Sequence, residues 1–186
     1  MGLLLNPSDW IVRWSQLVEP QATVLDIACG SGRHLQWFAE RGHTVIGIDR
    51  DIDQVRQRFS GAELICADME NDSWPLTVNG YARTFGAVIV ANYLWRPLLP
   101  AVLNSLAPGG VLLYETFALG NERFGRPARP DFLLEPGELL RTCASLQVIA
   151  YENGFRNNPA RIIQRIAAIR PKSGASQPVE PARCVL

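Results

Sequence analysis

The sequence predicts an α/β fold in which a doubly wound, mostly parallel sheet of seven strands lies between two layers of helices. Two observations predict it. Short runs rich in β-branched residues alternate with amphipathic stretches, and these runs are apolar throughout. Continuously apolar strands are typical of parallel sheets that helices cover on both faces. The chain has 186 residues, 47% of them apolar, which is enough for one such domain.

The chain begins with a predicted helix and a buried strand. Ser8 is a suitable N-cap, and the apolar residues that follow recur at helical spacing until Pro20 ends the helix. Among them, Trp10 and Trp14 are expected to pack on the sheet, although they are also placed to close over a ligand. Residues 23–28 form the first predicted strand.

The middle of the chain continues the alternation. Apolar strands are predicted at residues 44–48, 63–67, 86–92 and 111–117. The intervening helices are predicted at residues 33–40, 51–59 and 95–106. Gly42 ends the first of these helices, and the turn at residues 108–110 leads into the last of these strands.

The last third of the chain has a different pattern. Residues 118–135 are rich in Gly, Pro and Arg, which predicts a long loop, and long ordered loops are usually functional. A helix over residues 136–144 and two antiparallel strands at 146–152 and 161–170 complete the domain, which we expect to span residues 1–170. Residues 171–186 are expected to form a disordered tail because of their composition.

Charge and the lengths of the apolar runs argue against several classes of protein. The 18 Lys and Arg residues balance the 18 Asp and Glu residues, whereas domains that bind nucleic acid are usually strongly basic. The balance is uneven along the chain: residues 1–114 hold 8 cations and 11 anions, and residues 115–186 hold 10 and 7. No apolar run approaches the roughly 20 residues that cross a bilayer, so we expect no membrane partner.

No metal site is expected, because the cysteines form no C-x-x-C pair and only two histidines, His34 and His43, are available to join them. Free thiols and the lack of a secretory leader predict a cytoplasmic protein. We expect His34 to be structural, although it lies near the predicted ligand loop. The oligomeric state is not predicted.

The ends of the first three predicted strands carry carboxylates. Asp26 precedes a turn that contains Gly30 and Gly32. The dinucleotide-binding fingerprint G-x-G-x-x-G requires a third glycine at position 35, where this chain has Leu35. A carboxylate at that entrance would repel a pyrophosphate and suits a cationic ligand. Asp49 follows Gly32 by 17 residues, which fits either a ribose diol or a helix cap.

The third and fourth strand ends add further candidates. Asp68 is placed to accept a hydrogen bond from an exocyclic amine, and Met69 to pack on a flat ring, although both also suit an ordinary turn. Asn92 and Tyr93 end the fourth strand, at the centre of the predicted sheet. Three acids after three successive strands indicate a nucleoside site.

These motifs resemble those of the class I S-adenosylmethionine-dependent methyltransferases, in particular the small stand-alone bacterial type similar to tellurite-resistance methyltransferases. Residues 24–32 (Val-Leu-Asp-Ile-Ala-Cys-Gly-Ser-Gly) resemble the motif that holds the methionine part of the cofactor, and residues 106–110 resemble the Leu-x-Pro-Gly-Gly turn. The resemblance covers residues 8–170. It implies a Rossmann-like three-layer α/β/α fold whose last strand is antiparallel.

The resemblance implies transfer of a methyl group from S-adenosylmethionine to a small-molecule acceptor by in-line displacement, with S-adenosylhomocysteine as product. It assigns cofactor binding to Asp26, Ala28, Cys29, Gly30, Gly32, Asp49, Arg50, Asp68, Met69 and Asn92. The candidates for the acceptor side are Asn92, Tyr93 and Arg96, with Tyr114, Glu115, Arg123 and Arg126 around the long loop. A general base is needed only if the acceptor arrives protonated.

Other functions stay open at this point. Enzymes of this type that methylate base or amide nitrogens often carry Asn/Asp-Pro-Pro-Tyr, whereas this chain has Asn92-Tyr93-Leu94-Trp95, which argues against such acceptors. The alternatives are an RNA methyltransferase, a non-catalytic cofactor-binding module and, least favoured, a nucleotide-dependent oxidoreductase. We expect residues 120–130 to form a lid, and if the acceptor is anionic, the arginines of this segment would clamp it.

Overall fold

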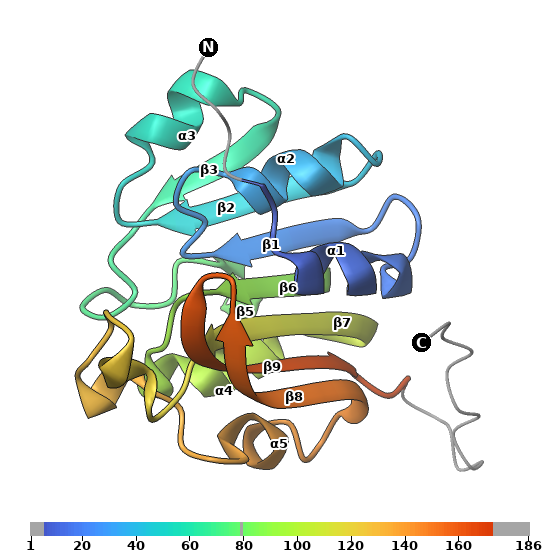
Figure 1. The fold of residues 1–186 in the computed structure, drawn as a ribbon. Helices are drawn as coiled ribbons and strands as arrows, with labels where there is room; N and C mark the ends of the chain where they lie inside the picture. The colour runs from blue at the N-terminus through green and yellow to red at the C-terminus, as the bar shows by residue number, and fades with distance from the viewer. Residues whose placement is uncertain (1–5, 79, 173–186) are drawn as a thin grey trace.

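The computed structural model describes residues 6–78 and 80–172, and its centre is a seven-stranded sheet (Figure 1). The spatial order of the strands is β3-β2-β1-β6-β7-β9-β8. Their bounds are Thr23–Ile27 (β1), Thr44–Asp49 (β2), Ala62–Cys66 (β3), Phe85–Ala91 (β6), Leu106–Phe117 (β7), Gln147–Asn157 (β8) and Ala160–Ile169 (β9). The first five of these strands in sequence pair in parallel, and β9 is antiparallel to both of its neighbours. The predicted fold class is confirmed.

Helices cover both faces of the sheet. Their bounds are Asp9–Trp14 (α1), Arg33–Ala39 (α2), Asp53–Arg58 (α3), Leu99–Asn104 (α4) and Glu138–Thr142 (α5). Short 3₁₀ turns extend α1 and precede α4, at Ser15–Leu17 and Arg96–Leu98. The helices are somewhat shorter than predicted, because their first and last turns adopt 3₁₀ or irregular geometry.

The apolar core consists of two clusters, one on each face of the sheet. One cluster contains Trp10 and Trp14 from α1 together with residues of α2 and α3, and both tryptophans are only 1% exposed. The other cluster packs Val102 of α4 and Leu139 of α5 against the opposite face. The two tryptophans therefore pack on the sheet, and the three predicted layers are present (Figure 1).

Two details differ from the prediction. Strand β7 starts at Leu106, before the predicted turn at residues 108–110, because a register shift between Phe85 and Ala87 lets the strand pair continue through that turn. A second, two-stranded sheet, β4 (Thr77–Val78) and β5 (Tyr81–Ala82), was not predicted. Two-residue strands are too short to show any periodicity.

The pairing of β1 with both β2 and β6 creates the switch point of the fold. The chain moves outward from β1 to β2 and β3, and then returns to the other side of β1 as β6. Ligands of such sheets bind beyond the carboxyl ends of the strands at this point. The loops that follow β1, β2, β3, β6 and β7 therefore surround the candidate site.

The chain leaves the sheet after β9. The predicted tail covers residues 171–186, of which 173–186 lie outside the described residues, so the domain boundary at residue 170 stays a prediction. Within the described residues, no helix has the length and apolar character needed to span a bilayer.

Gly30 and Gly32 offer a matched test of the turn after β1. Both have a positive φ, but a Cβ atom on Gly32 would lie 2.4 Å from Cγ2 of Val55, whereas a Cβ on Gly30 would meet nothing within 4 Å. We expect Gly32→Ala to lower the free energy of unfolding by roughly 2–4 kcal/mol and Gly30→Ala by roughly 1–2 kcal/mol. Denaturant unfolding measures both, and equal losses would contradict the packing role of Gly32.

Candidate functional site

A cavity of about 520 Å³ lies at the carboxyl ends of the parallel strands. Six of the ten predicted cofactor-binding residues line it: Ala28, Asp49, Arg50, Asp68, Met69 and Asn92. Tyr93, predicted for the acceptor side, lines it as well. The residues that sequence reasoning missed are Ala67, Glu70, Asn71, Leu94, Thr116, Pro127 and Phe132. Thr116 could have been expected from the sequence, because it lies two residues after the candidate Tyr114 and so shares a face of the strand with it.

Asp49 ties the end of β2 to the glycine turn after β1. Its Oδ2 accepts a hydrogen bond from the Gly30 N–H at 2.8 Å, and its Oδ1 accepts one from the Asp51 N–H at 3.0 Å. The residue before α3 is Ile52, so Asp49 does not cap that helix. Each carboxylate oxygen keeps a second lone pair, so the group can still accept hydrogen bonds from a ligand.

Two non-glycine residues with left-handed backbone conformations face the cavity from neighbouring strands. Ala28 after β1 has a φ of 55°, and Asn92 after β6 has a φ of 57°. Such conformations are uncommon and concentrate at functional sites. The Asn92 N–H donates to the Glu115 carbonyl oxygen at 2.8 Å, which holds this turn against β7.

Asp26 and Cys29 lie behind the glycine turn rather than on the cavity wall, which corrects the expectation that both face the ligand. Asp26 is 1% exposed, its Oδ2 has no hydrogen-bond partner among the described residues, and this atom lies 3.7 Å from Nδ1 of His34. Cys29 is also buried; burial, followed by the nearby carboxylates of Asp26 and Asp49, raises its pKa. Gly32 also packs inside, against Val55.

The third strand end holds an ionised carboxylate at the rim of the cavity. Asn71 Nδ2 donates to Asp68 Oδ2 at 2.9 Å, and the Glu70 N–H donates to Oδ1 at 3.1 Å. These hydrogen bonds lower the pKa of Asp68. Opposite it, burial and the nearby carboxylates raise the pKa of Tyr93 to about 12, so its phenol stays protonated at neutral pH.

Three residues expected on the acceptor side lie elsewhere, and the structure corrects those expectations. Tyr114 is buried, and its hydroxyl donates to the Tyr93 carbonyl oxygen at 2.9 Å. Glu115 points to the other face of the sheet and is 1% exposed. Side chains alternate between faces along a strand, so Thr116 reaches the cavity while Glu115 does not.

Arg96 holds the loop of residues 118–135 in place through hydrogen bonds instead of lining the cavity. Its Nε and Nη2 donate to the Glu138 carboxylate at 2.8 and 2.9 Å, and its Nη1 and Nη2 donate to the carbonyl oxygens of Asp131 and Leu133. Burial alone would raise the pKa of Glu138, but hydrogen bonds from Arg96 and the Glu135 N–H outweigh it and lower that pKa. The whole guanidinium is used in these contacts.

Residues 118–135 form one wall of the cavity, with Pro127 and Phe132 on its surface. The buried Asn121 side chain anchors this loop, since its Nδ2 donates to the Pro127 carbonyl oxygen and its Oδ1 accepts from the Ile162 N–H. Arg123 and Arg126 are exposed, and neither forms an ion pair with a described residue. Arg129 pairs with Asp131 at 2.8 Å.

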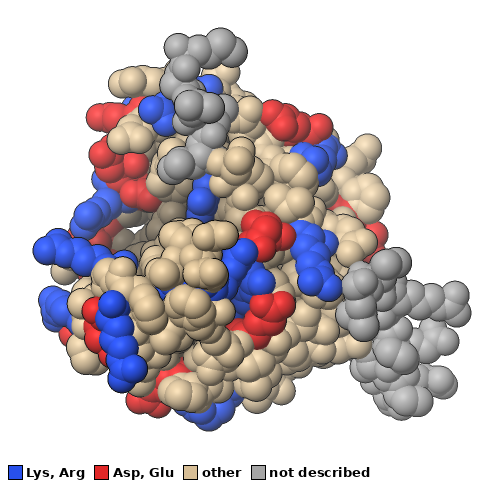
Figure 2. Space-filling view, in the orientation of Figure 1, with Lys and Arg blue, Asp and Glu red and all other residues tan. Residues whose placement is uncertain are grey.

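The cavity therefore has an acidic side and a side formed by an arginine-bearing loop. Figure 2 shows a hollow beside which Asp and Glu side chains gather on one rim and Lys and Arg side chains on the other. Among the cavity-lining residues, Asp49, Asp68 and Glu70 carry the negative charge. Within the described part of the chain, no cluster of His, Cys, Asp and Glu could hold a metal ion.

The comparisons with known proteins agree with this geometry. Residues 24–110 match a family model described as a methyltransferase domain. Among curated proteins, the chain is 31% identical over 103 residues to the malonyl-[acyl-carrier protein] O-methyltransferase of Salmonella typhimurium, covering 54% of this chain and 41% of that protein. It is 29% identical over 122 residues to YqeM of Bacillus subtilis, described as a methyltransferase, covering 59% and 48%. The chain spans less than half the length of each of these relatives.

Solved structures share the fold. TehB of Haemophilus influenzae superposes with a TM-score of 0.66 at 16% identity, covering 86% of this chain and 61% of that chain. An S-adenosylmethionine-dependent methyltransferase of Methanosarcina mazei gives 0.66 at 15% identity, covering 90% and 100%. These likenesses confirm the fold class.

Replacing Arg96 tests its role as a fastener of the loop. We expect Arg96→Ala to lower the free energy of unfolding by about 2 kcal/mol, less than for a fully buried pair because the Arg96 side chain is 38% exposed. Amide hydrogen exchange at Leu133 and Leu134 should become faster. The matched control is Arg129→Ala, whose exposed pair with Asp131 should contribute under 1 kcal/mol; equal effects of the two changes would refute the assignment.

Proposed function

We propose that the chain, whose residues 24–110 match a family model described as a methyltransferase domain, transfers a methyl group from S-adenosylmethionine to a small-molecule acceptor. The observation that carries this proposal is the acidic side of the cavity. Asp49 binds the glycine turn and keeps free lone pairs, Asp68 stands at the next strand end with a lowered pKa, and Met69 lies between polar neighbours as an apolar surface.

The residues present fit this cofactor. Its sulfonium and ammonium groups are cationic, and the residues that line the cavity include three carboxylates, Asp49, Asp68 and Glu70, against one arginine, Arg50. We assign the ribose hydroxyls to Asp49, the adenine amine to Asp68 and the adenine ring to Met69. Gly30 has a positive φ and open space where a Cβ would lie, so it leaves room for the methionine part.

S-adenosylmethionine, when bound, supplies an electrophilic methyl group on a positively charged sulfur. The chain itself contributes orientation and exclusion of water. Leu94, Thr116, Pro127 and Phe132 enclose the space opposite the acids. Alignment of an acceptor there can supply several kcal/mol of the barrier without any proton transfer.

The acceptor side of the cavity supports an acceptor that arrives as an anion. Tyr93 is the one ionisable side chain among the described lining residues on that side, and a pKa of about 12 makes it no base at neutral pH. The exposed Arg123 and Arg126 stand on the loop that forms this wall. One curated relative is named for O-methylation of a malonyl group, which is an acceptor of this chemical kind.

Asp49→Asn tests cofactor binding. The variant keeps one oxygen for the Gly30 N–H but loses the charged acceptor for two hydroxyls, so the dissociation constant of S-adenosylhomocysteine should rise roughly 10- to 100-fold. Isothermal titration calorimetry measures this value. Asp51→Asn serves as the control, because Asp51 accepts only from the Asp53 N–H and should leave the affinity unchanged. Binding of NAD, and not of S-adenosylhomocysteine, to the wild-type protein would refute the proposed function.

Arg126→Gln tests the anionic acceptor. A screen of S-adenosylhomocysteine release across thiols, carboxylates, phenols and oxyanions of selenium and tellurium identifies an acceptor. With that acceptor, Arg126→Gln and Arg123→Gln should raise KM severalfold and leave the affinity for S-adenosylhomocysteine intact. Arg129→Gln, already neutralised by Asp131, should change KM little. A loss of cofactor affinity with an unchanged KM would refute the clamp.

A further inference from the structure

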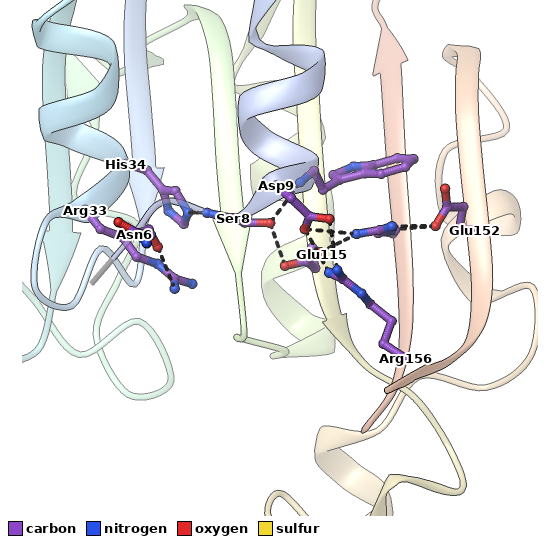
Figure 3. A network of polar contacts seen from close by, with 10 residues as sticks. Asn6, Ser8, Asp9, Arg33, His34, Glu115, Glu152 and Arg156 are labelled. Atoms are coloured by element: carbon purple, nitrogen blue, oxygen red, sulfur yellow. Dashed lines mark hydrogen bonds and ion pairs between the residues drawn. The ribbon is translucent and has the colours of Figure 1, made fainter. Parts of the chain in front are cut away.

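Glu115 is a deeply buried carboxylate that the proposed reaction leaves unused. It lies on β7 and is 1% exposed. Its Oε1 accepts a hydrogen bond from the Ser8 hydroxyl at 2.8 Å, and its Oε2 lies 3.3 Å from Nη1 of Arg165 on β9 (Figure 3). A buried carboxylate persists only where partners offset its loss of hydration, so this set of contacts has a specific role.

Ser8 joins three separate elements through its own atoms. Its Oγ accepts from the Trp10 N–H at 3.2 Å and so caps α1, while its hydroxyl hydrogen goes to Glu115 on β7. Its backbone N–H donates to Nε2 of His34 at 3.2 Å. His34 lies in the first turn of α2, directly after the glycine turn of the cavity. Since Nε2 accepts, the proton of the neutral ring is on Nδ1, which faces Asp26.

Charged residues of the C-terminal strands complete the arrangement. Arg165 reaches Asp9 at 3.3 Å and Glu152 at 2.6 Å, and its guanidinium lies 4.7 Å from the centroid of a Trp10 ring. Arg156 holds Asp9 through two hydrogen bonds of 2.8 and 3.0 Å. Asp9, the first residue of α1, is therefore tied to β8 through Arg156 and to β9 through Arg165 (Figure 3).

The backbone of Glu115 connects this arrangement to the cavity. Its carbonyl oxygen accepts from the N–H of Asn92, a left-handed residue that lines the cavity, and the next residue, Thr116, lines it too. The start of α1 is thus linked to the loops after β1, β6 and β7. These loops come from distant parts of the chain. The hydrogen bond between Ser8 and Glu115 connects the loop after β1 with the loops after β6 and β7.

We propose that Ser8 and Glu115 are positioning residues that couple the seating of α1 to the shape of the cofactor pocket. The inference rests on the proposed function, because the pocket it concerns is the one assigned to S-adenosylmethionine. Cofactor binding and the seating of α1 then favour each other, and this coupling is reciprocal by thermodynamic linkage. Neither side chain is among those that line the cavity.

The test is a double-mutant cycle on S-adenosylhomocysteine affinity with the full-length protein. Ser8→Ala and Glu115→Met should each weaken binding roughly tenfold, a size typical of coupled sites, and the double variant should weaken it little further, because each single change already removes the Ser8–Glu115 hydrogen bond. Ser8→Thr keeps the hydroxyl and should restore binding. The control is Ser15→Ala, since the Ser15 hydroxyl donates only to Val12 within the same helical segment.

A second measurement separates positioning from ordinary structural support. In the wild-type protein, saturating S-adenosylhomocysteine should slow amide hydrogen exchange across α1, and in Ser8→Ala this slowing should be lost. Should the variants have a lower Tm but unchanged affinity and unchanged slowing, the inference is wrong and the proposed function stands. If the wild-type protein does not bind S-adenosylhomocysteine, the proposed function is wrong, and this inference is wrong too because it rests on that function. Should Glu115→Met fail to fold, Ser8→Ala and Ser8→Thr alone decide the outcome.

Discussion

The parallel pairing of β1 with β2 on one side and β6 on the other is the constraint from which the site follows. It brings the carboxyl ends of strands that are distant in sequence to one edge of the sheet. Asp49 then reaches the Gly30 N–H, and Asn92 reaches the Glu115 carbonyl oxygen, across neighbouring strand ends. The left-handed conformations of Ala28 and Asn92 are tolerated because the pairing on both sides holds these turns in place.

Charged groups hold distant segments together on both faces of the sheet, and each face has its own set. On the face of α4 and α5, Arg96 uses its whole guanidinium to hold the long loop against α5. On the face of α1 and α2, Glu115 and Arg165 hold the first helix against the sheet. In both places a charged residue joins segments far apart in sequence and makes several polar contacts rather than one, although Glu115 is buried and the Arg96 side chain is 38% exposed.

The loop of residues 118–135 gains its shape from such contacts rather than from regular structure. Asn121, Arg96 and the backbone pairing of Leu119 with Leu134 determine where Pro127 and Phe132 lie. The proposed acceptor space is therefore bounded by a preorganised wall, and such a wall would lower the entropic cost of aligning an acceptor. Its arginines differ in availability, since Asp131 neutralises Arg129 while Arg123 and Arg126 face solvent.

The sequence by itself determined the fold class and the acidic side of the site. Apolar strands and the acids that end them are local patterns, and parallel strands place their ends together whatever the details of packing, so Asp49, Asp68, Met69 and Asn92 all line the cavity. Only the tertiary structure decided which face each remaining side chain takes. Three candidates for the acceptor side instead hold segments of the chain together: Arg96, Tyr114 and Glu115. Their partners are Glu138, the Tyr93 carbonyl oxygen and Ser8, which lie 21 to 107 residues away in the sequence. Hydrogen bonds between such distant segments leave no periodic trace in the sequence, and only the folded chain shows that Ser8 and Glu115 meet.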